Sequence, residues 1–562
     1  MRRAAWAVPV AAAFALAGCD FEGELKACAE AERCLVDGPV PIPRFPHNGA
    51  GLGSPFTVVS RGAPWMPRRP WLVYDTDGDP KWSYRVQLNK CDPGTDLAAC
   101  PFLTSASDGI PNANGSSYAL NTDLEIGKRY WWRVRACDTS APGAPCAAWS
   151  AARYFDVGRP EALPNDFEAN GTGDLAFADA HAGNLGKPEQ VYLYAGSGAA
   201  GWPASATASE LAVVAPSTMG DYTVVVAGAG DLDGDGTSDL AVSYRAIDPA
   251  LQLSPVDVFL GGTMVSNGLG FARSLRLSAR GGDFGAPLGR GGDLNGDGRS
   301  DLVVCQARQQ RALVFFGTSA GLVDRPDGDA QLNLPFAGQL NPFCAFAALS
   351  DVNADGFDDV AVAGEGQLRV FPGTAIPGQW NGVDLQPPPG TRGFARTVAG
   401  GDFNGDGHGD LVASTDDGHA FLFLGSTRWF DPGGLPPPIM FDVPLGAVAP
   451  AGDVNNDGYA DLVVGGGGAP VKVQLFLGQA SGPPKPSAIY GDGGLPGYGI
   501  SFAGAGDVTE DQYEDVAVGS ARGVLLFRGN PSDSDQGTDP LLFSPPAGSE
   551  QFGRGVAGGY GY

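Results

Sequence analysis

Short runs in which apolar and polar residues alternate recur along the chain, and turn residues separate them. "WSYRVQL" (82–88) alternates in this way, and "RYWWRVRA" (129–136) places Tyr130, Trp132 and Val134 on one face. No stretch keeps the i, i+3, i+4, i+7 spacing of an amphipathic helix. The pattern therefore predicts an all-β protein built from many short strands.

From residue 159 onwards, a second pattern is superimposed on these strands. An acidic string is followed by an apolar run and then by an alternating strand that ends in glycine, as in "VYLYAG", "VDVFLG" and "VQLFLG". The acidic strings begin at Asp166, Asp231, Asp293, Asp351, Asp402, Asp453 and Asp507, so successive copies start 51 to 65 residues apart. Repeats of this length indicate the blades of a propeller.

The acidic strings have the form D-x-[DN]-x-D-G-x-x-D, which suits a hard cation. Calcium takes six to eight oxygen ligands, and alternate residues of a tight loop can turn carboxylate and amide oxygens toward one point. Glycine at the sixth position permits the sharp turn. The predicted ligands are Asp166, Glu168, Asn170, Asp174, Asp231, Asp233, Asp235, Asp239, Asp293, Asn295, Asp297, Asp301, Asp351, Asn353, Asp355, Asp359, Asp402, Asn404, Asp406, Asp410, Asp453, Asn455, Asp457, Asp461, Asp507, Asp511 and Asp515.

An acidic hairpin turn is the alternative interpretation of any single string. Repetition favours the metal, and the sequence predicts about five to seven calcium ions. The middle five strings fit best. The first string has Glu168 at its third position, and the seventh has Thr509 there and Gln512 in place of the glycine. Whether these two strings bind metal is left open.

The strings and their flanks together resemble the FG-GAP repeats of integrin α-subunits. Phe-Gly or Phe-Ala strings precede several of them, as in "FGAPLGRGGD", "FARTVAGGD" and "FAGAGD". The resemblance covers 159–562 and implies a seven-bladed β-propeller with four antiparallel strands in each blade. It also implies that the calcium loops share one face and that longer loops bind partners. The inserts 179–190, 244–256 and 318–342 are the candidates for binding loops.

The tail "QFGRGVAGG" (551–559) has the flank that the first acidic string lacks. Residues 156–165, before Asp166, contain no Phe-Gly string. A propeller must join its first and last blades, because open sheet edges invite foreign pairing. We therefore expect 551–559 to supply a strand to the first blade and to close the ring.

The N-terminus is typical of a secreted bacterial lipoprotein. Arg2 and Arg3 precede an apolar run that is too short to span a bilayer comfortably, so 1–18 is predicted to be a signal peptide. Leu16-Ala17-Gly18-Cys19 resembles a lipobox, which implies a lipid on Cys19. The predicted location is the bacterial cell envelope, at the outer membrane, the cell surface or the periplasm, with 19–38 as an anchor segment.

Residues 39–158 are predicted to form a β-sandwich. The runs "WLVY", "YRVQL" and "RYWWRVRA" and the later "WS" resemble a fibronectin type III module, which implies a spacer or binding domain. "AWSAARYFDV" (148–157) is expected to be its last strand.

Once Cys19 is assigned to the lipid, an even number of cysteines remains. Export to an oxidising compartment favours disulfides, although eight cysteines allow 105 pairings. Proximity in the sequence suggests Cys28 with Cys34, Cys91 with Cys100, Cys137 with Cys146, and Cys305 with Cys344.

Composition restricts the function. The net charge of -27 and the pI of about 4.4 argue against nucleic acid, which needs clustered Lys and Arg. "GTSAG" (317–321) matches a nucleophile elbow, but it falls at a blade turn rather than before a helix. The sequence therefore predicts a non-enzymatic binding or adhesion protein with a protein or glycan ligand. An enzyme or enzyme subunit acting on polysaccharide or lipid, or an envelope scaffold, is the alternative.

Overall fold

The structure is a computed structural model of the whole chain. It describes residues 43–45, 50–52, 71–74, 82–91, 100–102, 110–112, 117–119, 128–138, 146–150, 152–157, 165–167, 173–179, 190–196, 209–211, 222–235, 237–246, 255–262, 272–278, 284–297, 299–334, 344–353, 357–364, 366–374, 376, 380–406, 408–435, 437–455, 457, 459–466, 471–492, 494–509, 513–530, 540–545 and 552–557. The predicted signal peptide, Cys19 and the pair Cys28 and Cys34 lie outside these residues. No helix among the described residues is long and apolar enough to cross a membrane.

Seven four-stranded antiparallel sheets form the blades of a propeller. Blade 1 comprises β9 (Leu175–Asp179), β10 (Gln190–Tyr194), β11 (Ser209–Leu211) and β36 (Phe552–Ala557), and blade 2 comprises β12 (Tyr222–Gly230), β13 (Asp239–Ala246), β14 (Val256–Leu260) and β15 (Ala272–Leu277). Blade 3 comprises β16 (Phe284–Gly292), β17 (Asp301–Gln306), β18 (Arg311–Phe315) and β19 (Ala330–Asn333), with the 3-10 turn η3 (Ala307–Gln309) between β17 and β18. Blade 4 comprises β20 (Ala345–Ala348), β21 (Val360–Gly364), β22 (Gln367–Phe371) and β23 (Val383–Leu385).

The last three blades follow the same order. Blade 5 comprises β24 (Val398–Gly401), β25 (Asp410–Ser414), β26 (His419–Phe423) and β27 (Ile439–Asp442). Blade 6 comprises β28 (Gly446–Gly452), β29 (Asp461–Gly466), β30 (Val473–Leu477) and β31 (Lys485–Tyr490). Blade 7 comprises β32 (Ser501–Gly506), β33 (Asp515–Ser520), β34 (Gly523–Phe527) and β35 (Leu541–Phe543). The seven-bladed propeller implied by the sequence is confirmed.

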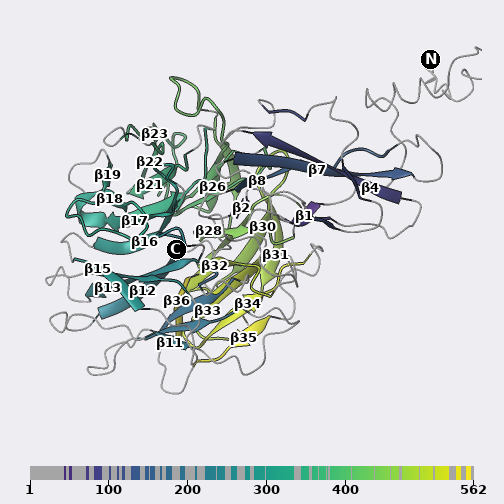
Figure 1. Cartoon of the computed structure of the whole chain (residues 1–562). Helices are drawn as coiled ribbons and strands as arrows, with labels where there is room; N and C mark the ends of the chain where they lie inside the picture. Colours follow the sequence, from purple (N-terminus) through teal and green to yellow (C-terminus); the bar gives the residue numbers. More distant parts are fainter. Residues whose placement is uncertain are drawn as a thin grey trace, which may run out of the picture.

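The innermost strands form a closed ring. β12, β16, β20, β24, β28 and β32 each contact the innermost strand of the next blade, and β36 contacts both β32 and β12. Figure 1 shows β12, β16, β28, β32 and β36 near the centre, with β11, β19, β23 and β35 at the periphery. β36 pairs with β9, where Val556 lies opposite Phe177. The tail therefore supplies the innermost strand of blade 1, as its sequence predicts.

The hydrophobic core of the propeller is divided among the junctions between neighbouring blades. One cluster of buried apolar side chains occupies each junction, from blades 1 and 2 through blades 6 and 7 to blades 7 and 1. The second strand of a blade is therefore covered on both faces, and every residue of β9, β17, β25 and β33 is buried. This explains why these strands are continuous apolar runs instead of alternating ones.

Two further sheets precede the propeller. The five-stranded one, called here the N-terminal sheet, has the order β2 (Ala50–Leu52), β8 (Arg153–Val157), β7 (Lys128–Asp138), β4 (Trp82–Cys91) and β5 (Ile110–Asn112). The three-stranded one has the order β1 (Pro43–Phe45), β3 (Trp71–Tyr74) and β6 (Ser117–Ala119). Alternate residues of β4 and β7 form one buried cluster, and Tyr118 of β6 packs against it. The alternation predicted for these two strands is confirmed.

The strand expected at 148–157 is shorter than predicted. β8 begins only at Arg153. Ser150 lies beside β7, but its hydroxyl accepts a hydrogen bond from the Val134 N–H, and its own N–H donates to the Val134 carbonyl. Because a side chain replaces one backbone partner, the regular ladder cannot extend through this segment.

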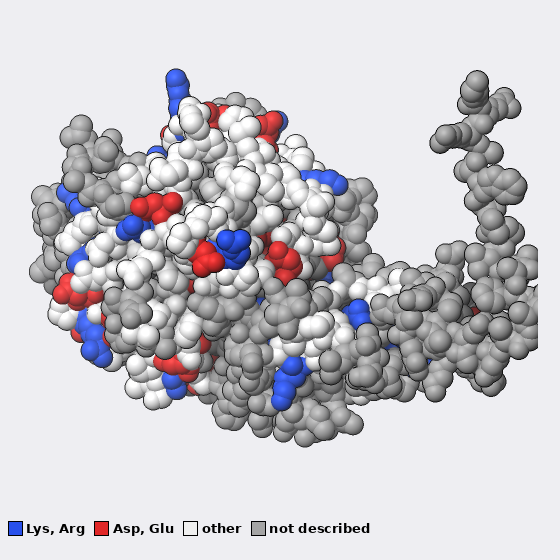
Figure 2. All heavy atoms as spheres, turned by 90° about the horizontal axis from the view of Figure 1, so that it is seen from above, with Lys and Arg blue, Asp and Glu red and all other residues white. Residues whose placement is uncertain are grey.

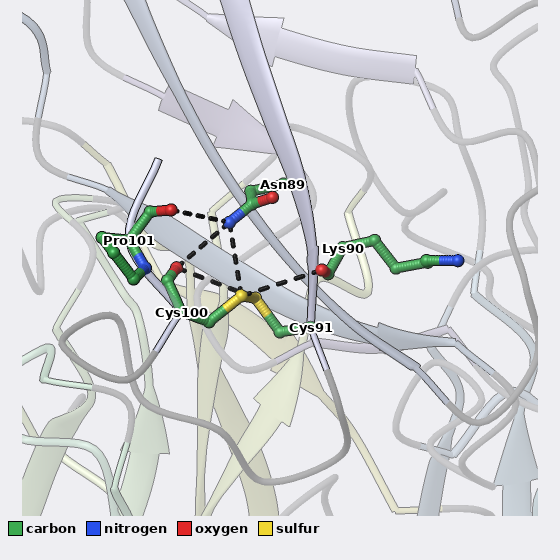
Figure 3. Close-up of a disulfide and its surroundings, with 5 residues drawn as sticks. All are labelled: Asn89, Lys90, Cys91, Cys100 and Pro101. Atoms are coloured by element: carbon green, nitrogen blue, oxygen red, sulfur yellow. Dashed lines mark hydrogen bonds between the residues drawn. A yellow bond between two sulfur atoms is a disulfide. The ribbon is translucent and has the colours of Figure 1, made fainter. Parts of the chain in front are cut away.

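Three of the suggested disulfides are present. They join Cys91 to Cys100, Cys137 to Cys146, and Cys305 to Cys344. Figure 3 shows the first of these, where the Asn89 side-chain amide donates to the carbonyls of Cys100 and Pro101, both at 3.1 Å. The third connects β17 of blade 3 to the residue before β20 of blade 4, so it joins neighbouring blades.

One of the predicted binding loops contains a strand of the propeller. The range 318–342 contains β19, the outer strand of blade 3. Within the same range, "GTSAG" forms a tight turn in which Thr318 and Gly321 exchange backbone hydrogen bonds. The string thus lacks the following helix that a nucleophile elbow requires.

Candidate cation-binding loops

In blades 2 to 7, an acidic string joins the innermost strand to the second strand. In blade 1, whose innermost strand β36 comes from the tail, the string directly precedes the second strand, β9. The seven strings form loops 1 to 7. They cover 166–174, 231–239, 293–301, 351–359, 402–410, 453–461 and 507–515. The residue before the loop has a left-handed backbone in Asn165, Gly230, Gly292, Ser350, Gly452 and Gly506. The strand pairing shifts register at several of these residues, as between Gly228 and Gly230. Glycine tolerates this conformation best, which explains the repeated "GD" that opens the strings.

The last aspartate of every loop is fully buried and holds the loop to its blade. One carboxylate oxygen accepts the N–H of the second loop residue, and the other accepts the N–H of the glycine that ends the third strand. These distances are 2.7–3.1 Å for Asp174, Asp239, Asp301, Asp359, Asp410, Asp461 and Asp515. The sequence predicted these residues as ligands, and the structure gives them a second, structural role. A carboxylate has about four lone-pair sites, so both roles are compatible.

No space is left for a side chain at the glycine that ends each third strand. In blade 6, a Cβ on Gly478 would lie 2.4 Å from the Ala460 carbonyl oxygen and 2.8 Å from that of Phe403. Gly261, Gly317, Gly373, Gly425 and Gly529 are similarly crowded by backbone carbonyls of the loops. A side chain there would force two loops apart.

The loops are linked to one another around the ring. The eighth residue of a loop donates its N–H to the carbonyl of the first residue of the preceding loop. This bond recurs from Ser238 to Asp166, Ser300 to Asp231, Asp358 to Asp293, Gly409 to Asp351, Ala460 to Asp402 and Glu514 to Asp453, at 2.8–3.5 Å. The backbone of each loop therefore positions the next, and the loops form one connected network.

Two acidic side chains at the eighth position strengthen this network, and the sequence motif did not predict their role. A carboxylate oxygen of Asp358 accepts the N–H of Asp293 at 2.8 Å, and one of Glu514 accepts the N–H of Asp453 at 2.9 Å. The available signal was an acidic residue directly before the last aspartate of loops 4 and 7.

The side-chain oxygens at the ligand positions of the loops suit a cation. In loop 2, Asp231, Asp233 and Asp239 each place one carboxylate oxygen within 4.8 Å of the others. Two oxygens on opposite sides of one calcium ion lie about 5 Å apart, because each Ca–O distance is about 2.3–2.6 Å. Loops 3, 4, 5 and 6 have Asn at the third position, whose amide oxygen is also a hard ligand.

Electrostatics favour a cation at the same place. Burial raises the pKa of Asp239, Asp301, Asp410 and Asp461 well above the usual range of a carboxyl group. Neighbouring loop carboxylates raise it further, whereas the two backbone N–H groups lower it. A bound divalent cation would supply the positive charge that these buried carboxylates lack.

Some predicted ligands lie outside the described residues, namely Glu168, Asn170, Asp355 and Asp511. In loop 7, Thr509 occupies the third position, and its buried hydroxyl has no hydrogen-bond partner in the described part of the chain. Metal binding stays a prediction for all seven loops, and for loops 1, 4 and 7 the described residues do not include the whole predicted ligand set.

Two family models match the propeller, an FG-GAP-like repeat at 351–413 and an FG-GAP repeat at 445–481. The chain contains FG-GAP repeats. Integrin αIIb of mouse is 33% identical over 168 residues, which is 25% of this chain and 16% of the integrin. Human integrin α6 is 42% identical over 91 residues, covering 15% of this chain and 8% of the integrin. The similarity to integrin α-subunits thus concerns repeats within the propeller and a small part of those proteins.

Among solved structures, the chain resembles a putative 6-phosphogluconolactonase from Bacteroides uniformis. The TM-score is 0.42 at 12% identity, and the match covers 68% of this chain and 99% of the other. A likeness of this size carries no inference about activity.

Proposed function

We propose that this FG-GAP chain is a calcium-stabilised, non-enzymatic binding protein that holds a protein or glycan on the propeller face opposite loops 1 to 7. The observation that supports this most is the backbone hydrogen bonding between successive loops. Because these bonds link the blades, the face that carries the loops has a structural role. In an antiparallel blade, the connection from second to third strand and the connection to the next blade lie at the other end. That end is the one available to a partner.

The opposite face carries apolar side chains suited to a protein partner. Leu445 precedes the innermost strand of blade 6 and is 48% exposed, and Ile500 precedes that of blade 7 and is 47% exposed. A partner seated on this face would cover both side chains, as the core of an interface covers apolar residues. Figure 2 shows basic and acidic side chains intermixed over the described part of one face, several of them next to one another. This mixture of charges, with the net charge of -27, disfavours nucleic acid.

A binding screen tests this proposal. The chain without its predicted signal peptide would be probed against arrays of purified proteins and glycans, in calcium and in EDTA. For a hit, we expect Leu445→Asp with Ile500→Asp to weaken binding at least about tenfold, because both remove apolar contacts. Met440→Asp is the matched control, since Met440 is 57% exposed on the outer strand β27. Equal binding by both variants would show that the partner sits elsewhere.

We also propose that Cys19 carries a lipid and anchors the chain in the bacterial cell envelope, with a fibronectin type III-like module at 39–158 as a spacer. The lipobox-like string and the oxidised cysteine pairs support export. Metabolic labelling with an alkyne fatty acid tests the anchor. Labelling should disappear in Cys19→Ser, and label retained in that variant would contradict the assignment.

A further inference from the structure

One buried ion pair joins the N-terminal sheet to a cation loop of the propeller. Arg153, the first residue of β8, places a guanidinium nitrogen 3.7 Å from a carboxylate oxygen of Asp453, the first residue of loop 6. Their side chains are only 2% and 7% exposed. A charged side chain is seldom buried without a partner, and Asp453 is a partner of opposite charge for Arg153.

Loop 6 is also more covered than the equivalent loops. Asn455 at its third position is buried, whereas Asn295 and Asn404 are half-buried. Asp457 at its fifth position is half-buried, whereas Asp297 and Asp406 are exposed.

Arg153 and a cation would use the same oxygen. In loops 3, 5 and 6, one oxygen of the first aspartate accepts the N–H of the fifth residue, at 3.0, 3.1 and 2.8 Å. In loop 6, the other oxygen of Asp453 is the one that faces Arg153. Loop 5 has the same Asp, Asn, Asp and Asp set at its ligand positions as loop 6.

We propose that loop 6 is the docking site of the N-terminal sheet, and that Arg153 competes there with the cation. This inference rests on cation binding by the loops, as proposed above. It has two consequences. Loop 6 binds a cation more weakly than loop 5, and loss of Arg153 both releases the sheet and strengthens cation binding at loop 6. The remaining loops keep their affinity.

The test uses the full chain without its predicted signal peptide, with terbium as the probe ion. Tyr459 sits at the seventh position of loop 6 and lies near carboxylates of both loop 6 and loop 5. The part of the sensitised terbium signal lost in Tyr459→Phe is therefore read in an Asp406→Ala background, which removes a predicted ligand of loop 5, so that it reports loop 6. We expect Arg153→Gln to tighten that site on the order of tenfold, by removal of one positive charge near a multivalent ion. Small-angle scattering should show a larger maximum dimension for the same variant.

Two further variants make the outcome decisive. Arg428→Gln removes an equal charge at an exposed position, 70% exposed, and should change neither readout. Arg153→Lys keeps the charge and should stay compact, with loop 6 affinity close to that of the unchanged chain. An Arg153→Gln protein that stays compact, or whose loop 6 affinity is unchanged or weaker, overturns the inference. Absence of terbium binding at every loop would instead overturn cation binding itself.

Discussion

The ring of Phe552 lies edge-on against the ring of Phe177, with 5.5 Å between their centroids. Phe552 belongs to β36 and Phe177 to β9, so the contact joins the last described strand to the first strand of the propeller. Phe552 is fully buried and also packs against Tyr192 of β10. The closure of the ring therefore depends on a packed aromatic cluster as well as on the pairing of two strands.

We expect Phe552→Ala to destabilise the propeller by about 3–5 kcal/mol, the usual cost of emptying a buried phenylalanine site. Thermal and denaturant unfolding monitored by circular dichroism would measure it. Leu542→Ala on β35 is the control, because Leu542 is 53% exposed and should cost less than about 0.5 kcal/mol. Similar midpoints for the two variants would mean that β36 is a dispensable strand.

Repetition made most of this fold predictable. The last aspartate of the loop and the glycine after the third strand recur in each blade. In blade 6, the N–H of Gly478 donates to Asp461, and the backbone of both loops 5 and 6 lies too close to Gly478 for a side chain. One sequence motif therefore predicts both the hydrogen bonds and the close packing of the backbone. The outer strand β19 was missed, since "AQLN" is short and lies at a sheet edge, where few packing demands shape a sequence. The contact between Arg153 and Asp453 was also missed, because no local pattern encodes which loop a separate sheet will cover.

The fifth and ninth positions of a loop should respond differently to calcium. Asp297→Ala removes an exposed predicted ligand and should lower the melting temperature mainly when calcium is present, because the hydrogen bond that Asp297 accepts from the Arg299 N–H is exposed. Asp301→Ala leaves the N–H groups of Leu294 and Gly317 without their acceptor. Each unpaired buried group costs about 1–3 kcal/mol, so this variant should be destabilised in EDTA as well.

Melting curves of both variants and the unchanged chain, in calcium and in EDTA, check this. For the unchanged chain, we expect calcium to raise the midpoint, because an ion that binds only the folded state stabilises it. If EDTA shifts no curve, the loops are structural turns. If Asp301→Ala loses stability only in calcium, its contacts with the backbone contribute little.

The disulfide between Cys305 and Cys344 should stabilise the junction of blades 3 and 4. It closes a sequence separation of 39 residues, for which chain entropy gives roughly 4 kcal/mol. Replacing both cysteines with alanine should lower the unfolding midpoint by a corresponding amount under oxidising conditions. The same replacement at Cys91 and Cys100, in the N-terminal part of the chain, should leave the propeller transition in place. An unchanged propeller midpoint in the first variant would show that the blades hold together without the bond.

The glycine at the end of a third strand gives the sharpest steric test. Gly478→Ala would press a methyl group against the carbonyls of Ala460 and Phe403, which belong to loops 6 and 5. Because both obstacles are backbone atoms in the network between loops, they cannot rotate away, and we expect a loss of about 1–3 kcal/mol. Gly491→Ala is the matched control, since a Cβ there meets no atom within 4 Å. Amide hydrogen exchange should then show faster opening at loops 5 and 6 in Gly478→Ala. Equal exchange in the two variants would mean that the loops can separate at little cost. The hydrogen-bond network between successive loops would then contribute little to the stability of this face.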